Sequence, residues 1–162
     1  MLHKYKKKIK YICLFKFITM IDIPKNKKII LFDGICNLCN DAVLKVIKYD
    51  KKNVFLFCSL QSKIGKEITD HLGIDIAKID SIILYEPSVS YDIKSTAALK
   101  IMQDFKGIWN LTYVLLLFPE WFRNSIYDYI AKNRYKWFGK KEHCLIPSPE
   151  LKVKFLDENP KV

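Results

Sequence analysis

The sequence predicts one α/β domain whose sheet contains both parallel and antiparallel strands. Three observations support this fold class. Two short, continuous apolar runs are each followed by a segment with helical periodicity, which is typical of parallel strands joined by helices. A third apolar run is followed, after a short turn, by another strand-like segment, as in an antiparallel hairpin. The 162 residues, half of them hydrophobic, suffice for a single hydrophobic core.

The first four elements are a strand, a helix, a second strand and a second helix. Continuous apolar runs at residues 28–32 and 54–58 are typical of buried strands. Residues 37–50 and 60–71 carry apolar side chains every three or four positions, which predicts helices with one buried face. Gly73 follows the second of these segments, and glycine readily adopts the left-handed conformation that ends helices.

A hairpin and a third helix complete the predicted core, residues 27–106. We expect strands at residues 82–85 and 89–93, joined by a turn at Glu86-Pro87-Ser88. Ser95 is expected to cap the helix that follows. The resulting order, β-α-β-α-β-β-α, is that of the minimal thioredoxin-like fold.

Residues 107–162 are predicted to form a helical extension that packs on the same domain. The apolar run at residues 111–118 is far too short to cross a bilayer, so we expect a helical cap on the core. A longer helix is expected over residues 121–136, and a last short one from Ser148. An exposed part of this extension would be available for contact with a protein or a membrane surface. The apolar side chains of the longer helix that we expect to face inward are Phe122, Ile126, Tyr129 and Ile130.

Positive charge is concentrated in an N-terminal tail, residues 1–26, that we expect to be poorly ordered. Residues 1–28 hold nine lysines and one aspartate, and so account for +8 of the formal net charge of +11. The rest of the chain carries only +3. A basic nucleic-acid-binding surface on the fold itself is therefore not expected.

The tail has two interpretations. Lysines between residues 4 and 10 precede an apolar stretch, as in a signal peptide, but Lys16 interrupts that stretch and no small-residue cleavage site follows. Alternatively, Met20 is the natural start and residues 1–19 are an upstream extension. Five cysteines, odd in number and widely scattered, do not resemble a disulfide-stapled secreted scaffold. We therefore expect a cytoplasmic protein.

Two of these cysteines, Cys36 and Cys39, lie where the first predicted strand gives way to the first helix. The N–H groups and positive dipole end of a helix N-terminus favour a thiolate, and a spacing of three lets two sulfurs meet across one turn. In thiol–disulfide exchange one cysteine attacks a substrate disulfide and the other resolves the mixed disulfide. Cys36, nearer the helix start, is expected to be the more exposed nucleophile, and Cys39 the partly buried resolver.

Asp33 precedes this pair by three residues and has two open interpretations. Functionally, its carboxyl group would relay a proton to or from the buried thiol or hold the loop by accepting loop N–H groups. Alternatively, it would simply brace the turn at Gly34. Cys58 ends an apolar run and is expected to be a core residue. Cys144 would be either a third redox cysteine or an inert one.

Zinc binding is the main alternative for Cys36 and Cys39. A structural zinc site needs four ligands, usually two spaced pairs. The second pair here would be His143 and Cys144, whose adjacent positions do not suit a tetrahedral site. We therefore expect neither a metal nor any other cofactor.

The motif resembles that of the DCC family of thiol-disulfide oxidoreductases, named for one aspartate and two cysteines. The resemblance covers about residues 27–157 and implies that Asp33, Cys36 and Cys39 are the family's motif residues. Thiol–disulfide exchange would take a disulfide-containing protein or a small thiol as its substrate and a cellular reductant as its partner. The matching segments are Asp33-Gly34-Ile35-Cys36-Asn37-Leu38-Cys39, Phe57-Cys58-Ser59-Leu60-Gln61-Ser62, Asp80-Ser81-Ile82-Ile83-Leu84, Ser95-Thr96-Ala97-Ala98-Leu99 and Asn133-Arg134-Tyr135-Lys136-Trp137-Phe138-Gly139.

One position departs from thioredoxin-type enzymes, which carry a proline just before the third strand, facing the dithiol. Here that position is Asp80-Ser81, so these two residues are the candidates for the substrate groove. The departure argues against a general protein-disulfide reductase. The sequence thus predicts thiol–disulfide exchange through Cys36 and Cys39, and the alternative is a non-catalytic module that binds a protein or a membrane through its aromatic C-terminal helices.

Overall fold

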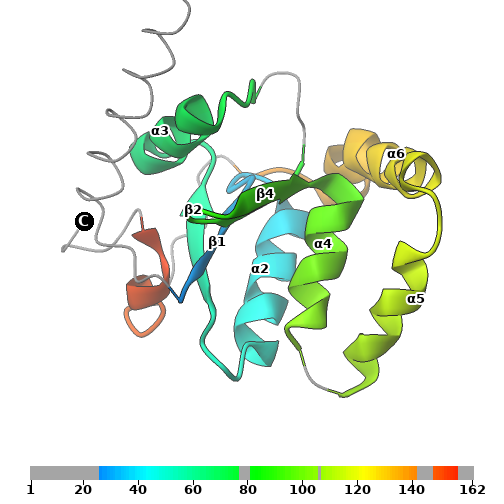
Figure 1. The fold of residues 1–162 in the computed structure, drawn as a ribbon. Coiled ribbons are helices and arrows are strands. Elements are labelled where there is room, and N and C mark those ends of the chain that lie inside the picture. Colours follow the sequence, from blue (N-terminus) through cyan, green and yellow to red (C-terminus); the bar gives the residue numbers. More distant parts are fainter. Residues whose placement is uncertain (1–25, 77–80, 106, 142–147, 157–162) are drawn as a thin grey trace, which may run out of the picture.

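The computed structural model describes residues 26–76, 81–105, 107–141 and 148–156, and it has the predicted mixed α/β architecture (Figure 1). The strands are β1 (Lys28–Phe32), β2 (Phe55–Ser59), β3 (Ile83–Glu86) and β4 (Ser90–Ile93). The helices are α2 (Asn37–Tyr49), α3 (Lys63–Leu72), α4 (Lys94–Gln103), α5 (Thr112–Leu116) and α6 (Glu120–Phe138), with short 3₁₀ turns at Gly107–Leu111 (η1) and Lys152–Lys154 (η2).

The four strands form one mixed sheet in the order β2-β1-β3-β4. β1 is parallel to β2, with Ile30 opposite Phe57, and antiparallel to β3, with Ile30 opposite Leu84. β3 and β4 form the predicted antiparallel hairpin. This topology is compatible with the thioredoxin-like fold that the element order predicts.

The sheet has a hydrophobic core on each face, because side chains alternate along its strands. Ile30 and Phe32 of β1 point to α2 and α4, where they pack with Val43. Ile29 and Leu31 point to the opposite face and pack with α3. Figure 1 shows this layering, with α2 and α4 on one side of the sheet and α3 on the other. The end of β1, from which the dithiol loop leaves, is thus held firmly between the two layers.

Two predicted helix starts are wrong. α3 begins at Lys63 rather than at residue 60, because the hydroxyl of Ser62 caps it by accepting a 2.9 Å hydrogen bond from the N–H of Gly65. Ser95 does not cap α4, which begins one residue earlier. Its hydroxyl instead donates a 2.5 Å hydrogen bond to Asn124 Oδ1 of α6.

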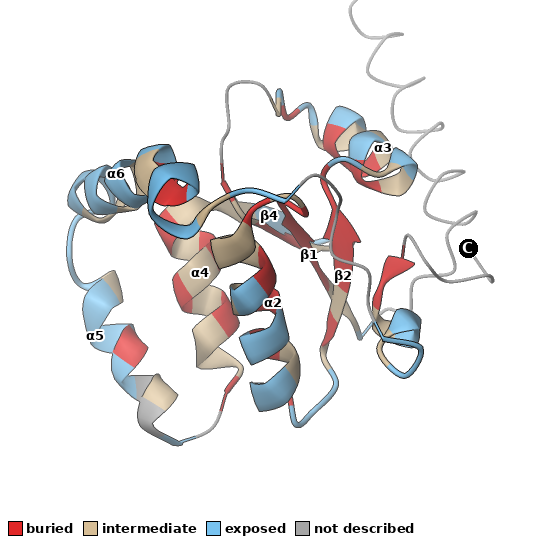
Figure 2. Ribbon diagram, turned by 180° about the vertical axis from the view of Figure 1, so that it is seen from behind, coloured by how far each residue is buried: buried red, intermediate tan, exposed pale blue. Residues whose placement is uncertain are grey.

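The predicted orientation of α6 is also wrong. Its buried residues are Ala131 and Arg134, and α6 is mostly pale blue in Figure 2. α6 packs through polar contacts, including a 2.8 Å ion pair between Asp128 and Lys94 and a 2.9 Å hydrogen bond from Ile82 N–H to the Tyr127 hydroxyl. All four side chains that the sequence pattern placed inward are exposed: Phe122, Ile126, Tyr129 and Ile130.

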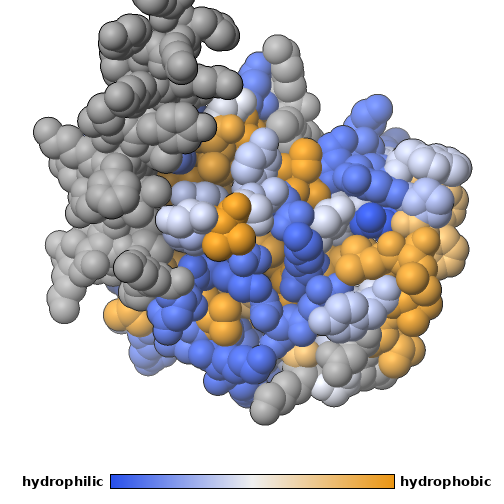
Figure 3. Space-filling model, viewed as in Figure 1, coloured by the Kyte–Doolittle hydropathy of each residue, from blue (hydrophilic) through white to orange (hydrophobic). Residues whose placement is uncertain are grey.

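These side chains belong to a large exposed apolar surface on α5 and α6, which we call the apolar face. Hydrophobic atoms gather over α5 on the right of the space-filling view (Figure 3). None of the helices within the described ranges is both long and apolar enough to cross a bilayer. The apolar face comprises Leu111, Tyr113, Val114, Leu115, Leu117, Phe118, Trp121, Phe122, Ile126, Tyr129, Ile130, Trp137 and Phe138.

The last described segment returns to the sheet. Phe155 is buried against Phe57, with ring centroids 5.5 Å apart. Ser148 begins a turn rather than a helix, since its carbonyl accepts the N–H of Leu151 at 2.9 Å and the only helical piece nearby is η2. The predictions for the tail and for Cys144 lie outside the described residues.

Candidate active site

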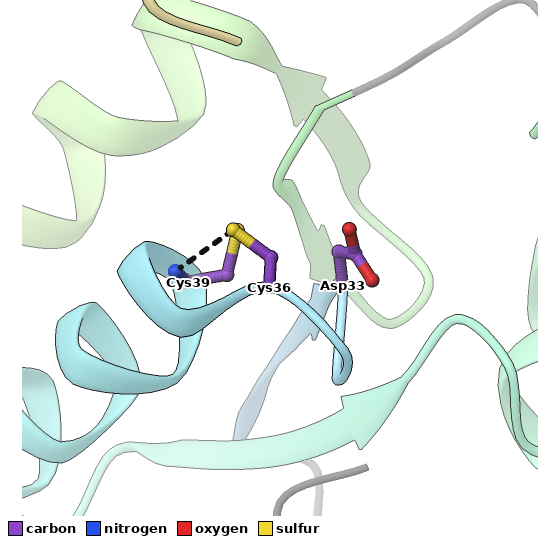
Figure 4. Close-up of side chains that lie close together, drawn as sticks. All are labelled: Asp33, Cys36 and Cys39. Carbon is purple, nitrogen blue, oxygen red and sulfur yellow. Dashed lines mark hydrogen bonds between the residues drawn. The ribbon is translucent and has the colours of Figure 1, made fainter. Parts of the chain in front are cut away.

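The two motif cysteines lie together at the loop from β1 to α2 (Figure 4). Cys36 is the N-cap residue of α2, and its sulfur accepts a 3.3 Å hydrogen bond from the N–H of Cys39. One oxygen of Asp33 and the two sulfurs lie within 4.8 Å of one another. Both cysteines are free thiols in this structure. The spacing of three residues thus brings the two sulfurs together, and Asp33 lies beside them.

Cys36 is the more buried cysteine, which reverses the expected exposure. Its side chain is fully inaccessible, whereas Cys39 is half-buried. The segment just after α6 lies over the loop, because Lys141 N–H donates to Ile35 O at 2.8 Å and Lys140 pairs with Cys36 in a β-bridge. Asn37 Nδ2 adds a 2.8 Å hydrogen bond to Phe138 O. The sequence pattern carried no signal for this long-range covering.

Cys39 is held as a neutral thiol. Burial raises the pKa of Cys39 well above its usual value, and the hydrogen bond and charge of the neighbouring Cys36 raise it further. Arg134 opposes these effects and Asp33 adds to them, but both contributions are smaller. The two sulfurs therefore have different roles: the Cys36 sulfur accepts hydrogen bonds at the helix start, and Cys39 keeps its proton.

Asp33 is buried in a network that reaches two other parts of the chain. Its Oδ2 forms a 2.6 Å ion pair with Arg134 Nη2 and accepts a hydrogen bond from the Tyr135 hydroxyl. Its Oδ1 accepts from Gln61 Nε2 at 2.8 Å and from Ile35 N–H at 3.2 Å. Both oxygens of the carboxylate are thus occupied by donors, so Asp33 ties the dithiol loop to α6 and to the loop after β2.

The hydrogen bonds of this network determine the protonation states of Asp33 and Tyr135. Burial alone would raise the pKa of Asp33, but the hydrogen bonds from Tyr135, Ile35 and Arg134 outweigh it and hold the pKa below its usual range. Burial and the hydrogen bond to Asp33 together raise the pKa of Tyr135 to about 12. Near neutral pH the site therefore contains a carboxylate, a guanidinium and a neutral phenol. The carboxylate accepts the Ile35 N–H and so holds the loop. In its ionised form Asp33 can accept a proton from a thiol but has none to give, so its part in proton transfer stays a prediction.

The site contains three residues that the sequence pattern did not single out as functional: Gln61, Arg134 and Tyr135. Gln61 also bonds the loop directly, since its Oε1 accepts from Gly34 N–H at 3.1 Å. All three residues lie inside segments that carried the family resemblance. A buried carboxylate needs a partner of opposite charge, and this need is the physical signal that points to a distant arginine.

Ser81 lies beside this network, at two adjoining cavities. The first, of about 230 Å³, lies between α2, α4 and α6 and is lined mainly by apolar side chains together with Cys39, Asp33 and Arg134. The second, of about 280 Å³, is more polar and is lined by Gln61, Lys66 and Tyr135 among others. Asp33, Ser81 and Arg134 line both. The groove candidate Asp80 lies outside the described residues.

A metal ion is poorly accommodated by this arrangement. Asp33, Cys36 and Cys39 would offer three ligand atoms. However, both Asp33 oxygens already accept hydrogen bonds, and the Arg134 guanidinium lies 2.6 Å from one of them. A buried positive charge at this position opposes a second cation. The donor set fits thiol chemistry better than metal binding.

Comparison with known proteins agrees with this chemistry. A family model described as "DCC1-like thiol-disulfide oxidoreductase" matches residues 30–140. The chain is 43% identical over 138 residues to "Uncharacterized protein YuxK" of Bacillus subtilis (strain 168), covering 85% of this chain and 98% of that protein. It is 39% identical over 119 residues to "DCC family protein At1g52590, chloroplastic" of Arabidopsis thaliana, covering 73% of this chain and 69% of that one. No solved structure matches the chain.

The matched span includes both motif cysteines, Asp33, Gln61, Arg134 and Tyr135, so every residue of the network lies within it. The chain belongs to the DCC1-like thiol-disulfide oxidoreductase family.

Proposed function

We propose that this protein is a thiol–disulfide oxidoreductase that works through Cys36 and Cys39. The observation that carries the proposal is the placement of the Cys36 sulfur at the N-terminus of α2, where it accepts the Cys39 N–H, with the second thiol within 4.8 Å. A helix N-terminus stabilises a thiolate there, and this proximity permits a disulfide.

The reaction consists of two exchanges. The Cys36 thiolate attacks one sulfur of a substrate disulfide, an S–S bond forms to Cys36, and the other substrate half leaves as a thiolate that takes up a proton. Cys39 then loses its proton to solvent or to the released thiolate and attacks the Cys36 sulfur. The Cys36–Cys39 disulfide forms, the second substrate thiolate leaves, and two electrons have passed to the substrate.

The raised pKa of Cys39 suits this order. Much of the increase comes from burial, and part comes from the hydrogen bond and charge of Cys36. Once Cys36 is bonded to substrate its negative charge is gone, so that part of the increase disappears. Cys39 would thus be activated only when a mixed disulfide is present to be resolved. A cellular dithiol reductant would restore the pair.

The substrate is proposed to be a disulfide of a protein or a small thiol, and the working compartment a reducing one such as the cytoplasm. The name of the Arabidopsis relative places that protein in the chloroplast. The cytoplasmic location therefore stays a prediction for this chain.

The decisive experiment is a redox titration in which mass spectrometry maps all five cysteines. We expect Cys36 and Cys39 to form one reversible disulfide and Cys36→Ser to abolish oxidation by a test disulfide. Cys58→Ala is the matched control, because Cys58 is also a fully buried thiol but lies in β2. A pair that never forms a disulfide at any potential, while the protein stays folded, would refute the proposal.

A second candidate function is attachment to an anionic membrane surface through the apolar face. Trp121 is 72% exposed and Leu117 is 82% exposed, which is unusual for residues of their size. The last turns of α6 and the residues after it add the exposed cations Lys132, Lys136 and Lys140. Exposed aromatic and aliphatic side chains next to lysines are typical of helices that lie in a bilayer interface.

Vesicle sedimentation tests this attachment. We expect binding to vesicles that contain phosphatidylglycerol and little binding to phosphatidylcholine alone. Leu117→Ser combined with Trp121→Ser should abolish it. Val89→Ser combined with Val153→Ser is the matched control, since both valines are at least 71% exposed but lie outside the apolar face. A concentration-dependent dimer that the first double variant dissociates would instead assign the face to a second copy.

A further inference from the structure

We infer that the cavity between α2, α4 and α6 holds the apolar arm of a small-molecule disulfide, with Ser81 as its polar contact. This inference rests on the proposed function and narrows its substrate class. It predicts a slender substrate with an aromatic or branched aliphatic group attached near the disulfide, rather than a disulfide on the surface of a folded protein.

The first argument is access to the dithiol. Cys36 is fully buried and covered by the segment at residues 139–141, so a broad protein surface does not reach it. The cavity, in contrast, is lined by Cys39, whose sulfur lies within 4.8 Å of the Cys36 sulfur. A substrate sulfur placed at the Cys39 end of the cavity therefore lies close to the Cys36 sulfur, and a local opening of the covering segment brings the two sulfurs into contact.

The second argument is the size and chemistry of the cavity. A dry cavity of about 150 Å³ lined by aliphatic and aromatic side chains binds benzene. This one measures about 230 Å³, and its walls include Leu38, Ala42, Ala98 and Ile130. A phenyl ring with one or two further carbon atoms therefore fits, whereas a charged peptide arm such as that of glutathione would lose its hydration without compensation.

The third argument is Ser81. It is only 5% exposed, lines the cavity, and its hydroxyl has no hydrogen-bond partner among the described residues. Two other polar contacts at this end are already made, since Asp33 pairs with Arg134 and the Tyr127 hydroxyl accepts Ile82 N–H. A buried hydroxyl left without a partner costs free energy, and a bound ligand that supplies one recovers it. Ser81 is thus positioned to bond a polar atom next to the substrate sulfur.

The step itself is the exchange given above, in single-turnover form. The pre-reduced protein gives two electrons to the substrate, the Cys36–Cys39 disulfide forms, and both halves of the substrate are released as thiols. No other reductant is needed, so the concentration dependence of the rate reports on substrate recognition alone.

The experiment uses two probes that share one half, the mixed disulfides of cysteine with benzyl thiol and with 2-hydroxyethanethiol. We expect the benzyl probe to half-saturate the wild-type protein at a concentration at least about tenfold lower. Ala98→Leu fills the cavity and should remove that preference, because it raises the half-saturating concentration of the benzyl probe to that of the hydroxyethyl probe. Ala42→Leu, from the opposite wall, replaces it if the first variant does not fold. Val89→Leu, on the exposed hairpin, is the control.

Ser81→Ala separates a ligand contact from a structural one. We expect it to raise the half-saturating concentration of the benzyl probe several-fold, in keeping with one lost hydrogen bond, and to leave thermal stability unchanged or higher. Lower stability with unchanged kinetics would assign Ser81 a structural role and overturn its part in the inference.

Two outcomes overturn the cavity assignment. Equal effects of Ala98→Leu on both probes would do so, as would faster oxidation of the pair by a protein disulfide such as that of insulin. Binding of benzyl methyl thioether, which cannot react, is measured in parallel by NMR and should be lost in Ala98→Leu. If neither probe oxidises the pair while the thioether binds, the cavity is real but the proposed function fails.

Discussion

Helices α2 and α6 both contribute to the dithiol site, but they present opposite kinds of side chain to the rest of the molecule. α2 buries Val43 and Val46 against the sheet and turns its charged residues outward. α6 buries Arg134 and exposes most of its large apolar side chains. The periodicity of a sequence therefore locates an apolar stripe, but polar partners elsewhere decide whether that stripe faces the core.

The inward face of α6 is held by a series of specific partners. Arg134 meets Asp33, Asp128 meets Lys94 and Asn124 meets Ser95. Each of these pairs would leave a polar group without its partner if α6 turned by half a rotation. This polar packing also brings α6 to the active-site loop.

The largest expected effect is that of Arg134→Met. Removing the guanidinium leaves the buried Asp33 carboxylate without its ion-pair partner, and breaking a buried pair costs about 3–5 kcal/mol. Urea unfolding measures the change. Lys136→Met, two residues along the same helix and exposed, should change the stability by no more than about 0.5 kcal/mol. Equal stabilities of the two variants would contradict the view that α6 is anchored by charge.

The next effect contrasts apolar truncations on the two helices. Val43→Ala in α2 should cost about 2 kcal/mol, because Val43 is 2% exposed within the core. Ile126→Ala in α6 removes more carbon atoms but should cost no more than about 0.5 kcal/mol, because Ile126 is 50% exposed. The two unfolding curves test the comparison directly, and a larger loss for Ile126→Ala would reverse it.

The third effect is a change in the stability of the protein with pH. The pKa of Asp33 is lowered in the folded protein, so its contribution to stability is complete above its ordinary pKa of 3.8 and is lost as the pH falls through the folded value. Asp33→Asn lacks this titration. The stability difference between wild type and Asp33→Asn should therefore be constant above about pH 5 and shrink on acidification. A difference that does not depend on pH would rule out an ionised Asp33 as the anchor of α6.

The smallest effect is expected for Tyr135→Phe. It removes one hydrogen bond to Asp33 from a side chain near the edge of the network, which should cost about 1 kcal/mol. The pKa of Asp33 should move upward, since this hydrogen bond is the largest of the interactions that lower it. NMR titration of the Asp33 carboxyl group measures the shift. Tyr129→Phe, exposed on the same helix, should leave that pKa unchanged.

The sequence predicts the core of the fold well. Strands β1 and β2 are continuous apolar runs and helix α2 has a periodic apolar stripe, and their burial reproduces these patterns. The dithiol was equally accessible from sequence, since a strand-to-helix junction is a local feature. The roles of Gln61 and Arg134 could not be predicted from the sequence. Each residue lies at least 28 positions from Asp33, and its side chain is of a type that also suits an exposed surface. Polar pairs between distant residues produce no periodic pattern in the sequence.

The segment that covers Cys36 has a consequence for the kinetics of any reagent. The left-handed Gly139 and the 2.8 Å bond from Lys141 N–H to Ile35 O close this segment over a sulfur with no accessible surface. A small alkylating agent therefore reacts with Cys36 only during local openings, as in amide hydrogen exchange. The alkylation rate of Cys36 in the folded protein, divided by the rate for a free thiolate, measures the free energy of that opening. Access to the active site therefore depends on the stability of the last turn of α6.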